Sequence, residues 1–353
     1  MNPDFLRSLI VPPGLPAIEA VARMTRTAKR IILVADSDDI LQGIVTDYDV
    51  RMAILARTDL SCPVRDIMNA RPITATIGLD EQAYFAILED KSCHYIPIVD
   101  AVGKIVGVRF REEFLHFIED HPGNLVVVMA GGLGTRLRPM TEAVPKPLLT
   151  VGGRPILFIL LDQILSENFD HIYVSVHYKS EMIVKAIRDV PKYRERVRFV
   201  TEPTALGTAG ALALLPELPR APFAVVNADL LTNLSLSEML RFHTTHGNDV
   251  TMALKTVTHT IPYGVADVVD GRVVGLREKP QYVFQLNTGA YVVSPAVLDH
   301  VPSGQPWNMT DLVSDMLTRG GQVGSFPVHE YWLDIGTPDQ YERAQVEYEA
   351  NFT

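Results

Sequence analysis

Cysteine and net positive charge are both scarce in this sequence. Its 353 residues include only Cys62 and Cys93, too few for a disulfide framework or a zinc site of the usual spacing. Aspartate and glutamate outnumber lysine and arginine by 42 to 32, giving a formal charge of −10. Because no basic surface dominates, nucleic acid is not an expected partner. We expect small molecules, whose phosphates would meet local positive charge.

Long uncharged apolar runs are also absent. No stretch approaches the ~20 residues that a membrane span needs. The N-terminus, Met1–Leu6, carries Asp4 and leads into Pro12-Pro13 instead of a basic and then apolar signal segment. We therefore expect no membrane partner and a cytoplasmic location, and the length suggests two domains.

The N-terminal third contains a repeat with a constant offset of 64 residues. Matching residues recur without a gap: Gly14-Leu15 and Gly78-Leu79, Asp36 and Asp100, Gly43-Ile44 and Gly107-Val108. Each copy predicts a strand, a helix, two strands and a second helix. In the first copy these are Leu9–Val11, Ile18–Met24, Ile31–Ala35, Gln42–Val45 and Asp49–Leu55. In the second copy they are Ile73–Ala75, Gln82–Leu88, Tyr95–Val99, Ile105–Val108 and Glu113–Phe117.

The first copy carries the segment Gly43-Ile44-Val45-Thr46-Asp47-Tyr48-Asp49. With the repeat, it resembles a tandem pair of CBS domains over residues 1–121, with copies at about 1–59 and 60–121. The resemblance implies an α/β pair with a purine nucleotide effector held by Thr46 and Asp49. The second copy departs from the pattern, with Phe110 and Glu113 at the corresponding positions. A pair that serves only for packing or dimerisation is the alternative.

A different pattern follows the turn cluster Asp120–Gly123. Leu125–Met129 is an uninterrupted apolar run, as expected of a strand buried on both faces of a parallel sheet. Further strands are predicted at Ile172–Val176, Val197–Thr201 and Phe223–Asn227. Helices are predicted at Ile156–Glu167, Ser180–Arg188, Thr208–Leu215 and Ser235–His246. This alternation predicts a Rossmann-like doubly wound α/β domain over residues 122–353, with ligands at the carboxyl ends of its strands.

A glycine-rich loop follows the first of these strands and reads AGGLGTRLRPMT over residues 130–141. It is neither a dinucleotide fingerprint nor a Walker A loop. Arg136 offers a fork of donors for phosphate oxygens, and Lys146 is a second cation between two prolines. The backbone groups expected to approach a nucleotide are those of Gly131, Gly132, Gly134 and Thr135.

This loop and the segments after it resemble the sugar-phosphate nucleotidyltransferases, from about residue 124 to 336. The resemblance implies that Asp229 and Asp334 bind metal. It also implies base reading by Glu202, Gly207 and Thr208, and a sugar phosphate pocket with Gly264, Glu278, Lys279 and Asn287.

The chemistry of such a transfer agrees with this set of residues. A sugar phosphate is already an anionic nucleophile, so the reaction needs two polyanions held in line and charge neutralised as pyrophosphate leaves. Mg²⁺ prefers oxygen ligands and suits two aspartates. Arg136 and Lys146 are the expected catalytic cations. No histidine is required, and His243 and His246 are interpreted as a solvated helix face.

Glu202 bears on the choice of base. A carboxylate can accept two hydrogen bonds from the N1–H and N2–H₂ edge of guanine, whereas relatives that use UTP or dTTP commonly carry glutamine nearby. We therefore expect GTP as the triphosphate and glucosamine 1-phosphate or mannose 1-phosphate as the second substrate. The combination with CBS domains resembles bacterial guanylyltransferases of nonulosonic (legionaminic) acid and surface-glycan pathways. The alternatives are uridylyl or thymidylyl transfer to glucose 1-phosphate, and a catalytically silent nucleotide sensor. A homo-oligomer is expected.

Overall fold

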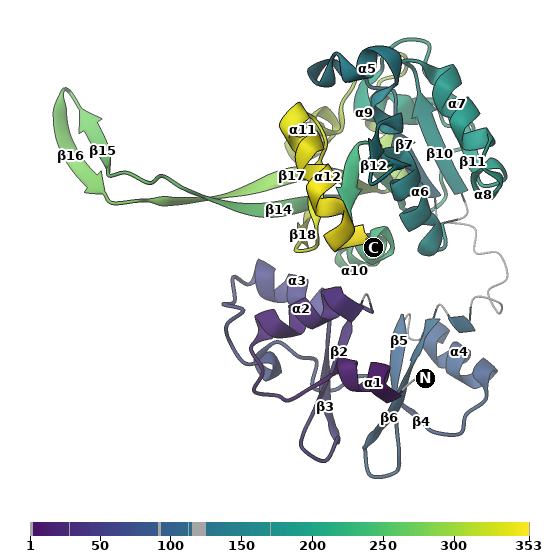
Figure 1. The fold of residues 1–353 in the computed structure, drawn as a ribbon, viewed down its shortest axis with the longest axis vertical. Helices are drawn as coiled ribbons and strands as arrows, with labels where there is room; N and C mark the ends of the chain where they lie inside the picture. The colour runs from purple at the N-terminus through teal and green to yellow at the C-terminus, as the bar shows by residue number, and fades with distance from the viewer. Residues whose placement is uncertain are drawn as a thin grey trace. The chain divides into compact units, whose positions relative to one another are not determined.

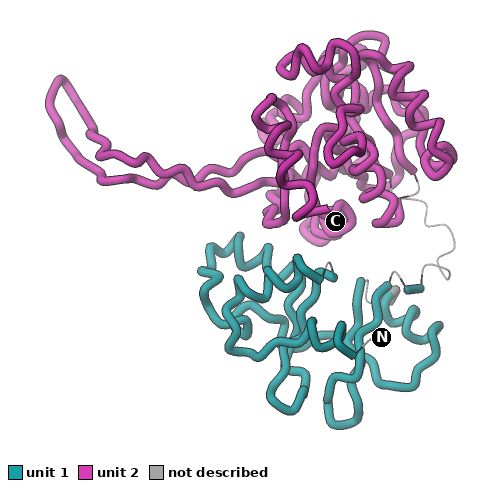
Figure 2. Tube along the Cα trace, in the orientation of Figure 1, with its two compact units in different colours: residues 1–122 teal, residues 123–353 magenta. Residues whose placement is uncertain are grey.

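The protein forms two compact units, residues 1–122 and 123–353 (Figure 2). The computed structural model describes residues 3–27, 29–90, 93–111, 113–114, 125–169 and 171–352. The turn predicted at Asp120–Gly123 lies outside the described residues, as do Phe117 and most of the helix predicted from Glu113. Among the described residues, no helix combines the length and apolar character that a membrane crossing requires.

Unit 1, residues 1–122, contains two three-stranded sheets with the same internal order. The first sheet has strands β1 (Ile10–Val11), β2 (Ile31–Ala35) and β3 (Leu41–Thr46), and the second has β4 (Ala75–Thr76), β5 (Tyr95–Val99) and β6 (Ile105–Phe110). In each sheet the middle strand pairs parallel with the first strand and antiparallel with the third. Each antiparallel pair has a register shift, between Val34 and Ala35 and between Ile98 and Val99. These irregularities are 64 residues apart, the offset of the sequence repeat.

The helices of unit 1 follow the same repeat. They are α1 (Pro3–Leu9), α2 (Ala17–Thr27), α3 (Asp47–Leu55) and α4 (Glu81–Asp90). A shared core joins the two copies, because Leu33 and Ile44 of the first pack in one buried cluster with Val108 and Phe110 of the second. Phe110 therefore has a packing role at the position where the first copy has Thr46, which accounts for the departure from the first copy's pattern.

Unit 2, residues 123–353, is built on a seven-stranded sheet (Figure 1). Its strands along the chain are β7 (Leu125–Met129), β10 (His171–Val176), β11 (Val197–Thr201), β12 (Phe223–Asn227), β14 (Val250–Thr260), β17 (Gln281–Val293) and β18 (Val323–Val328). Their order is β11-β10-β7-β12-β17-β14-β18. The first four are parallel, whereas β17 is antiparallel to both of its neighbours. Val127 and Val225 face one buried cluster, and the alternate Val126 and Val226 are equally buried, so this part of the sheet is covered on both faces.

The remaining elements of unit 2 are helices, 3₁₀ turns and short strands. The helices are α5 (Met140–Ala143), α6 (Ile156–Ser166), α7 (Ser180–Arg188), α8 (Pro191–Arg194), α9 (Gly207–Gly210), α10 (Leu236–His246), α11 (Met309–Thr318) and α12 (Pro338–Phe352). The 3₁₀ turns that matter below are η3 (Thr135–Leu137), η4 (Lys146–Leu148) and η5 (Ala211–Leu214). The short strands are β8 (Thr150–Val151), β9 (Arg154–Pro155), β13 (Leu230–Thr232), β15 (Val265–Val269), β16 (Arg272–Arg277) and β19 (Trp332–Asp334).

Two helix predictions need correction. The segment predicted as one helix at Thr208–Leu215 divides into α9 and the 3₁₀ turn η5. His243 was interpreted as solvated but is 1% exposed. Its ring nitrogens lie 2.9 Å from the Thr251 and Ser294 hydroxyls. These partners come from β14 and from the residue after β17, neither of which was predicted from the sequence. Burial lowers the pKa of His243 to about 4.

A long two-stranded ribbon projects from the sheet of unit 2 (Figure 1). We call residues 256–286 the arm: the outer halves of β14 and β17 with the hairpin β15–β16 between them. The hairpin turn is Asp270-Gly271, with φ of 49° and 74°. Two consecutive left-handed residues are what a two-residue turn of this kind requires, and Asp-Gly suits it well.

Candidate functional site

A cavity of about 440 Å³ opens at the carboxyl ends of the parallel strands of unit 2. Beneath it β7 ends at Met129, β11 ends just before Glu202, and β12 ends at Asn227. Ligands of open α/β sheets bind at such an edge. Its lining includes ten of the residues predicted from the sequence: Gly131, Gly132, Gly134, Thr135, Arg136, Lys146, Glu202, Gly207, Thr208 and Asp229.

The glycine-rich loop lies against the walls of this cavity. Gly134 has a left-handed φ of 61° and leads into η3, and its carbonyl accepts a 2.8 Å hydrogen bond from the Thr141 hydroxyl. A Cβ on Gly131 would collide with Oε1 of Glu202, whereas one on Gly132 would meet nothing within 4 Å. Close packing therefore requires glycine at Gly131, and the side of the loop at Gly132 stays open.

Glu202 is held firmly at the back of the cavity. It is 5% exposed, and its Oε1 accepts a 2.6 Å hydrogen bond from the Ser175 hydroxyl. Its Oε2 accepts a 2.9 Å hydrogen bond from the backbone N–H of Leu206. A carboxylate offers about four acceptor positions, so these two bonds orient the group and leave capacity for more.

The segment with Gly207 and Thr208 is fastened to the residues before α11. The Trp307 carbonyl accepts 2.9 Å hydrogen bonds from the N–H groups of Ala209 and Gly210. The Thr208 hydroxyl accepts a 2.9 Å bond from the N–H of Met309. At Gly207, φ is 74° and a Cβ would press on the Trp307 carbonyl, so glycine is required there.

Two aspartates and one lysine meet beside the cavity. In the pairing of β13 with β19, Leu230 is opposite Asp334, and the N–H of Ile335 donates to the Asp229 carbonyl at 3.2 Å. This places Asp229 and Asp334 next to each other although about a hundred residues separate them. Lys146, 8% exposed, forms an ion pair with Asp229 and lies 3.9 Å from Oδ1 of Asp334.

This group fits a divalent cation. Oδ1 of Asp229 and Oδ1 of Asp334 are buried and have no hydrogen-bond partner among the described residues. Burial and the neighbouring Asp229 raise the pKa of Asp334, against the opposing effect of Lys146 and Arg136. Buried oxygens that repel each other are what a bound cation would stabilise.

The residues predicted for the sugar phosphate are divided. Asn287 stays near the cavity, because its Oδ1 accepts a 3.1 Å bond from the N–H of Gly289, which packs on Asn227. Gly264, Glu278 and Lys279 are together on the arm, exposed, and none of them lines the cavity. Their role in sugar phosphate binding stays a prediction.

Thr46 and Asp49 of unit 1 satisfy each other. The Thr46 hydroxyl accepts a 3.3 Å bond from the N–H of Asp49, and the Asp49 carboxylate accepts a 2.8 Å bond from the N–H of Thr46. The Thr46 hydroxyl also donates to that carboxylate at 2.6 Å. This capping box at the start of α3 accounts for both residue types without a ligand. Nucleotide binding by this pair stays a prediction.

Three lining residues were given no role from the sequence: Asn227, Asn308 and Gly336. Asn308 precedes α11 and forms a capping box with Asp311. Asn three residues before Asp at the start of an apolar pattern was the available signal. Gly336 lies against the Arg136 guanidinium. Only the folded chain reveals that contact.

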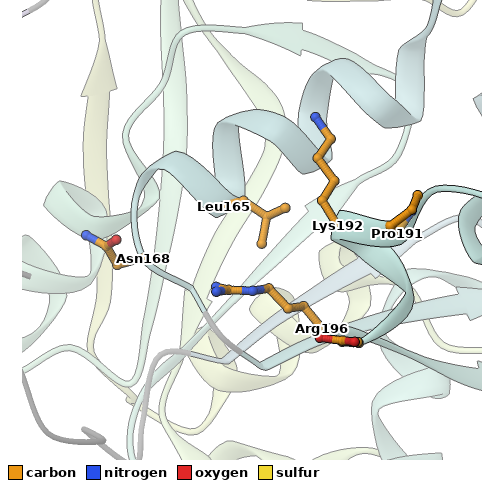
Figure 3. A pocket seen from close by; sticks show the side chains of 6 residues that line it. Leu165, Asn168, Pro191, Lys192 and Arg196 are labelled. Carbon is orange, nitrogen blue, oxygen red and sulfur yellow. The ribbon is translucent and has the colours of Figure 1, made fainter. Parts of the chain in front are cut away.

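A second cavity of unit 2, about 450 Å³, lies between the end of α6 and α8 (Figure 3). It is lined by Leu165, Asn168, Pro191, Lys192, Glu195 and Arg196. Lys192 forms an ion pair with Asp162 beside it. None of the residues predicted from the sequence lies there, so the first cavity is the candidate site.

Comparison with known families identifies unit 2. The Nucleotidyl transferase family matches residues 125–351. The chain belongs to the nucleotidyl transferase family. The CBS domain family matches residues 1–56 of this nucleotidyl transferase. Both family resemblances and the Rossmann-like α/β fold class are thereby confirmed. Nucleotidyl transferases of this family generally use a divalent metal.

Individual proteins similar to this nucleotidyl transferase cover the same part of the chain. Mannose-1-phosphate guanyltransferase beta-B of Xenopus laevis is 34% identical over 61% of this chain. The alignment spans 62% of that relative, so the chain matches only about three-fifths of its curated relatives' length. The crystal structure of HddC from Yersinia pseudotuberculosis is similar with a TM-score of 0.51 and 25% identity, over 64% of this chain and 99% of that one. A putative glucose-1-phosphate thymidylyltransferase from Bacillus anthracis shares the fold, with a TM-score of 0.52 and 22% identity over 65% of this chain and 96% of that one.

Proposed function

We propose that this nucleotidyl transferase converts GTP and a sugar 1-phosphate into a GDP-sugar and pyrophosphate. The observation that carries the proposal is the meeting of Lys146, Asp229 and Asp334 beside a glycine-lined cavity at the carboxyl edge of the sheet. A purely structural domain has no need of two buried aspartate oxygens without hydrogen-bond partners.

In the proposed reaction an oxygen of the sugar phosphate attacks the α-phosphorus of the triphosphate. A new P–O bond forms there, and the bond from the α-phosphorus to the bridging oxygen breaks, so pyrophosphate leaves with the electron pair. Arg136 and Lys146 hold the triphosphate oxygens and oppose the charge that develops on the leaving group. The backbone N–H groups of Gly131, Gly132, Gly134 and Thr135 approach the nucleotide.

We propose Mg²⁺ as the metal, held by Asp229 and Asp334. When bound, it supplies positive charge against the polyphosphate. The unpartnered oxygens of the two aspartates and the raised pKa of Asp334 support this assignment. Lys146 would then stand between the aspartates and the triphosphate.

Guanine as the base rests on Glu202. Its bonds to Ser175 and Leu206 hold the carboxylate in one orientation, with acceptor positions left for the N1–H and N2–H₂ groups of guanine. The Xenopus laevis relative, by its name a guanyltransferase, supports the same base. Glu202→Gln should lower kcat/KM for GTP by about 10–100-fold, because a charge-assisted pair of hydrogen bonds is lost. Glu181→Gln, at an exposed glutamate of α7, is the matched control. Equal values for the two variants would exclude base reading by Glu202.

The sugar is proposed as mannose 1-phosphate or glucosamine 1-phosphate. The relative's name supports mannose, whereas the combination with an N-terminal CBS region supports glucosamine in nonulosonic acid or surface-glycan synthesis. In either case we assign the sugar and its phosphate to Gly264, Glu278, Lys279 and Asn287. Gly207 and Thr208 would complete the base pocket beside Glu202.

One experiment tests the reaction and both substrates. The full chain with Mg²⁺ is incubated with GTP, ATP, CTP, UTP or dTTP, each with mannose, glucosamine or glucose 1-phosphate. Pyrophosphate release and the mass of the NDP-sugar are measured. We expect GTP to give the highest rate with mannose or glucosamine 1-phosphate. Faster turnover of UTP or dTTP would overturn the guanine assignment, and no pyrophosphate from any pair would favour the nucleotide sensor.

We also propose a purine nucleotide as an effector at Thr46 and Asp49 of the CBS region. The match of that family to residues 1–56 supports it. A ligand there would have to compete for, or add to, the capping bonds between the two side chains. A change of turnover with added AMP or GMP, lost in Asp49→Ala, is the expected result.

A further inference from the structure

The arm exposes an unusual amount of apolar surface. Ten large apolar side chains on it are exposed: Val257, Tyr263, Val268, Val269, Val273, Val274, Leu276, Val283, Phe284 and Leu286. Val268 and Val269 are consecutive in one strand, and Val273 and Val274 are consecutive in the strand paired with it. Because neighbouring side chains of a strand point to opposite faces, both faces of the ribbon are apolar. Such a surface is typical of an interface.

Both edges of the arm are open. β14 pairs with β18 only as far as Lys255, and β17 pairs with β12 only from Ala290 onward. Between these limits the two strands pair with each other alone. An isolated two-stranded ribbon is marginally stable in water, and open edges are templates for pairing with another chain. The arm therefore needs a covering surface to hold its shape.

The cavity, in turn, lacks the groups that the arm carries. Arg136 and Lys146 are the cations among its lining residues, and Lys146 is already paired with Asp229. Two phosphorylated substrates must enter it under the proposed function. Glu278 and Lys279, assigned to the second of them, lie on the arm, where Lys279 has a left-handed φ of 43°. A lysine in this conformation is uncommon and directs attention to its position.

We propose that the arm docks on a second copy of this chain and brings Glu278 and Lys279 to that copy's cavity, a proposal that rests on the proposed function. The exchange is reciprocal, as in a two-fold symmetric dimer. Leu133, an exposed apolar residue in the glycine-rich loop that lines the cavity, offers the partner a contact for the arm's apolar side chains.

The pairing of the ribbon favours a second copy over the arm's own cavity. The ladder from Lys255 opposite Leu286 to Thr260 opposite Gln281 is continuous, and the N–H of Ile261 extends it to the Pro280 carbonyl at 3.1 Å. Ile261 is six residues beyond Lys255, so the ribbon carries Lys279 ~20 Å from the sheet at ~3.3 Å per residue. A unit as long as residues 123–353 has a radius of gyration of about 17 Å. Folding back would break this ladder, whereas reaching a neighbour keeps it.

Mixed dimers test the exchange. The chain with Lys146→Ala and the chain with Lys279→Ala carry different affinity tags, are co-expressed, and are purified through both tags. Each variant alone is expected to be inactive. The mixed dimer has one cavity with an intact Lys146 that receives the arm with an intact Lys279, so we expect about half the turnover of the wild-type dimer. Lys185→Ala, at an exposed lysine of α7, replaces either variant as the matched control.

The outcomes separate this inference from the proposed function. Wild-type turnover with a mixed dimer as inactive as its parents would overturn the exchange and leave the proposed function standing. If the wild type itself shows no turnover, hydrogen exchange decides independently of activity. Amides of residues 257–284 should be protected, and their protection should fall on dilution to the monomer. Fast exchange at every concentration, or protection that persists in the monomer, would overturn the exchange.

Discussion

The cavity and the arm of unit 2 carry motif residues of similar specificity in very different surroundings. At the cavity, Lys146 and Glu202 are buried and held by partners from other elements of the sheet. On the arm, Glu278 and Lys279 are exposed on a ribbon with open edges. A motif therefore indicates which chemistry a residue suits, whereas burial and hydrogen bonding decide whether one chain alone can hold it in place.

The largest expected effect would break the cavity's side of this comparison. Asp334→Asn keeps the shape of the side chain but removes one of the two charges assigned to the metal, so kcat/KM should fall by about 10³-fold. Asp162→Asn is the matched control, because Asp162 forms ion pairs with Arg154 and Lys192 outside the cavity. Steady-state kinetics over a range of Mg²⁺ concentrations, with thermal melting to verify folding, measures the effect. Activity within threefold of the wild type would exclude Asp334 as a metal ligand.

A second pair of variants sharpens the claim that the cavity is prebuilt. Gly131→Ala places a methyl group against the Glu202 carboxylate, which must move and give up its bond to Ser175. We expect kcat/KM for GTP to fall about 10–100-fold, as for a lost charge-assisted hydrogen bond. Gly132→Ala meets nothing within 4 Å and should behave like the wild type. If both variants have the same kcat/KM, the position of Glu202 does not limit GTP use.

The root of the arm gives a pH dependence. His243 bonds Thr251 in β14 and Ser294 after β17, and its pKa is lowered from 6.5 to about 4 by burial. The unfolded chain binds this proton at pH values where the folded chain does not. Stability is therefore full above about pH 6.5 and is lost as the pH falls toward 4, by up to about 3 kcal/mol. Urea unfolding from pH 7 to 4.5 should show the loss, and His243→Gln should flatten it. His246→Gln, at an exposed histidine of the same helix, should not; an equally steep loss in His243→Gln would assign the effect to other groups.

The smallest effect extends the comparison to unit 1, where two polar residues bond each other. Thr46→Val removes the hydroxyl that caps α3 and should lower the free energy of unfolding by about 1 kcal/mol. If the effector proposal holds, AMP or GMP should raise the melting temperature of the wild type but not of Asp49→Ala. Glu113→Ala in the second copy is the control. A shift that persists in Asp49→Ala would leave the pair with capping alone.

Much of the parallel part of the sheet could be predicted from the sequence. Leu125–Met129, Val197–Thr201 and Phe223–Asn227 have the same bounds in the structure, because short apolar runs between turns are typical of strands buried on both faces. The cavity residues followed from motifs at the ends of these strands. The antiparallel β17 and the burial of His243 could not be predicted, since both depend on contacts between distant segments.

The sequence by itself determined the family, the repeat of 64 residues in unit 1, and the residues that suit phosphate, metal and base. Local patterns specify these features because a strand, a turn or a glycine-rich loop depends mainly on its own neighbours. Only the tertiary structure decided that Asp229 and Asp334 lie side by side and that Gly131 leaves room for Glu202. Only it separated Lys279 from its own cavity. Those outcomes depend on how strands pair across a hundred residues or more, which no local pattern specifies.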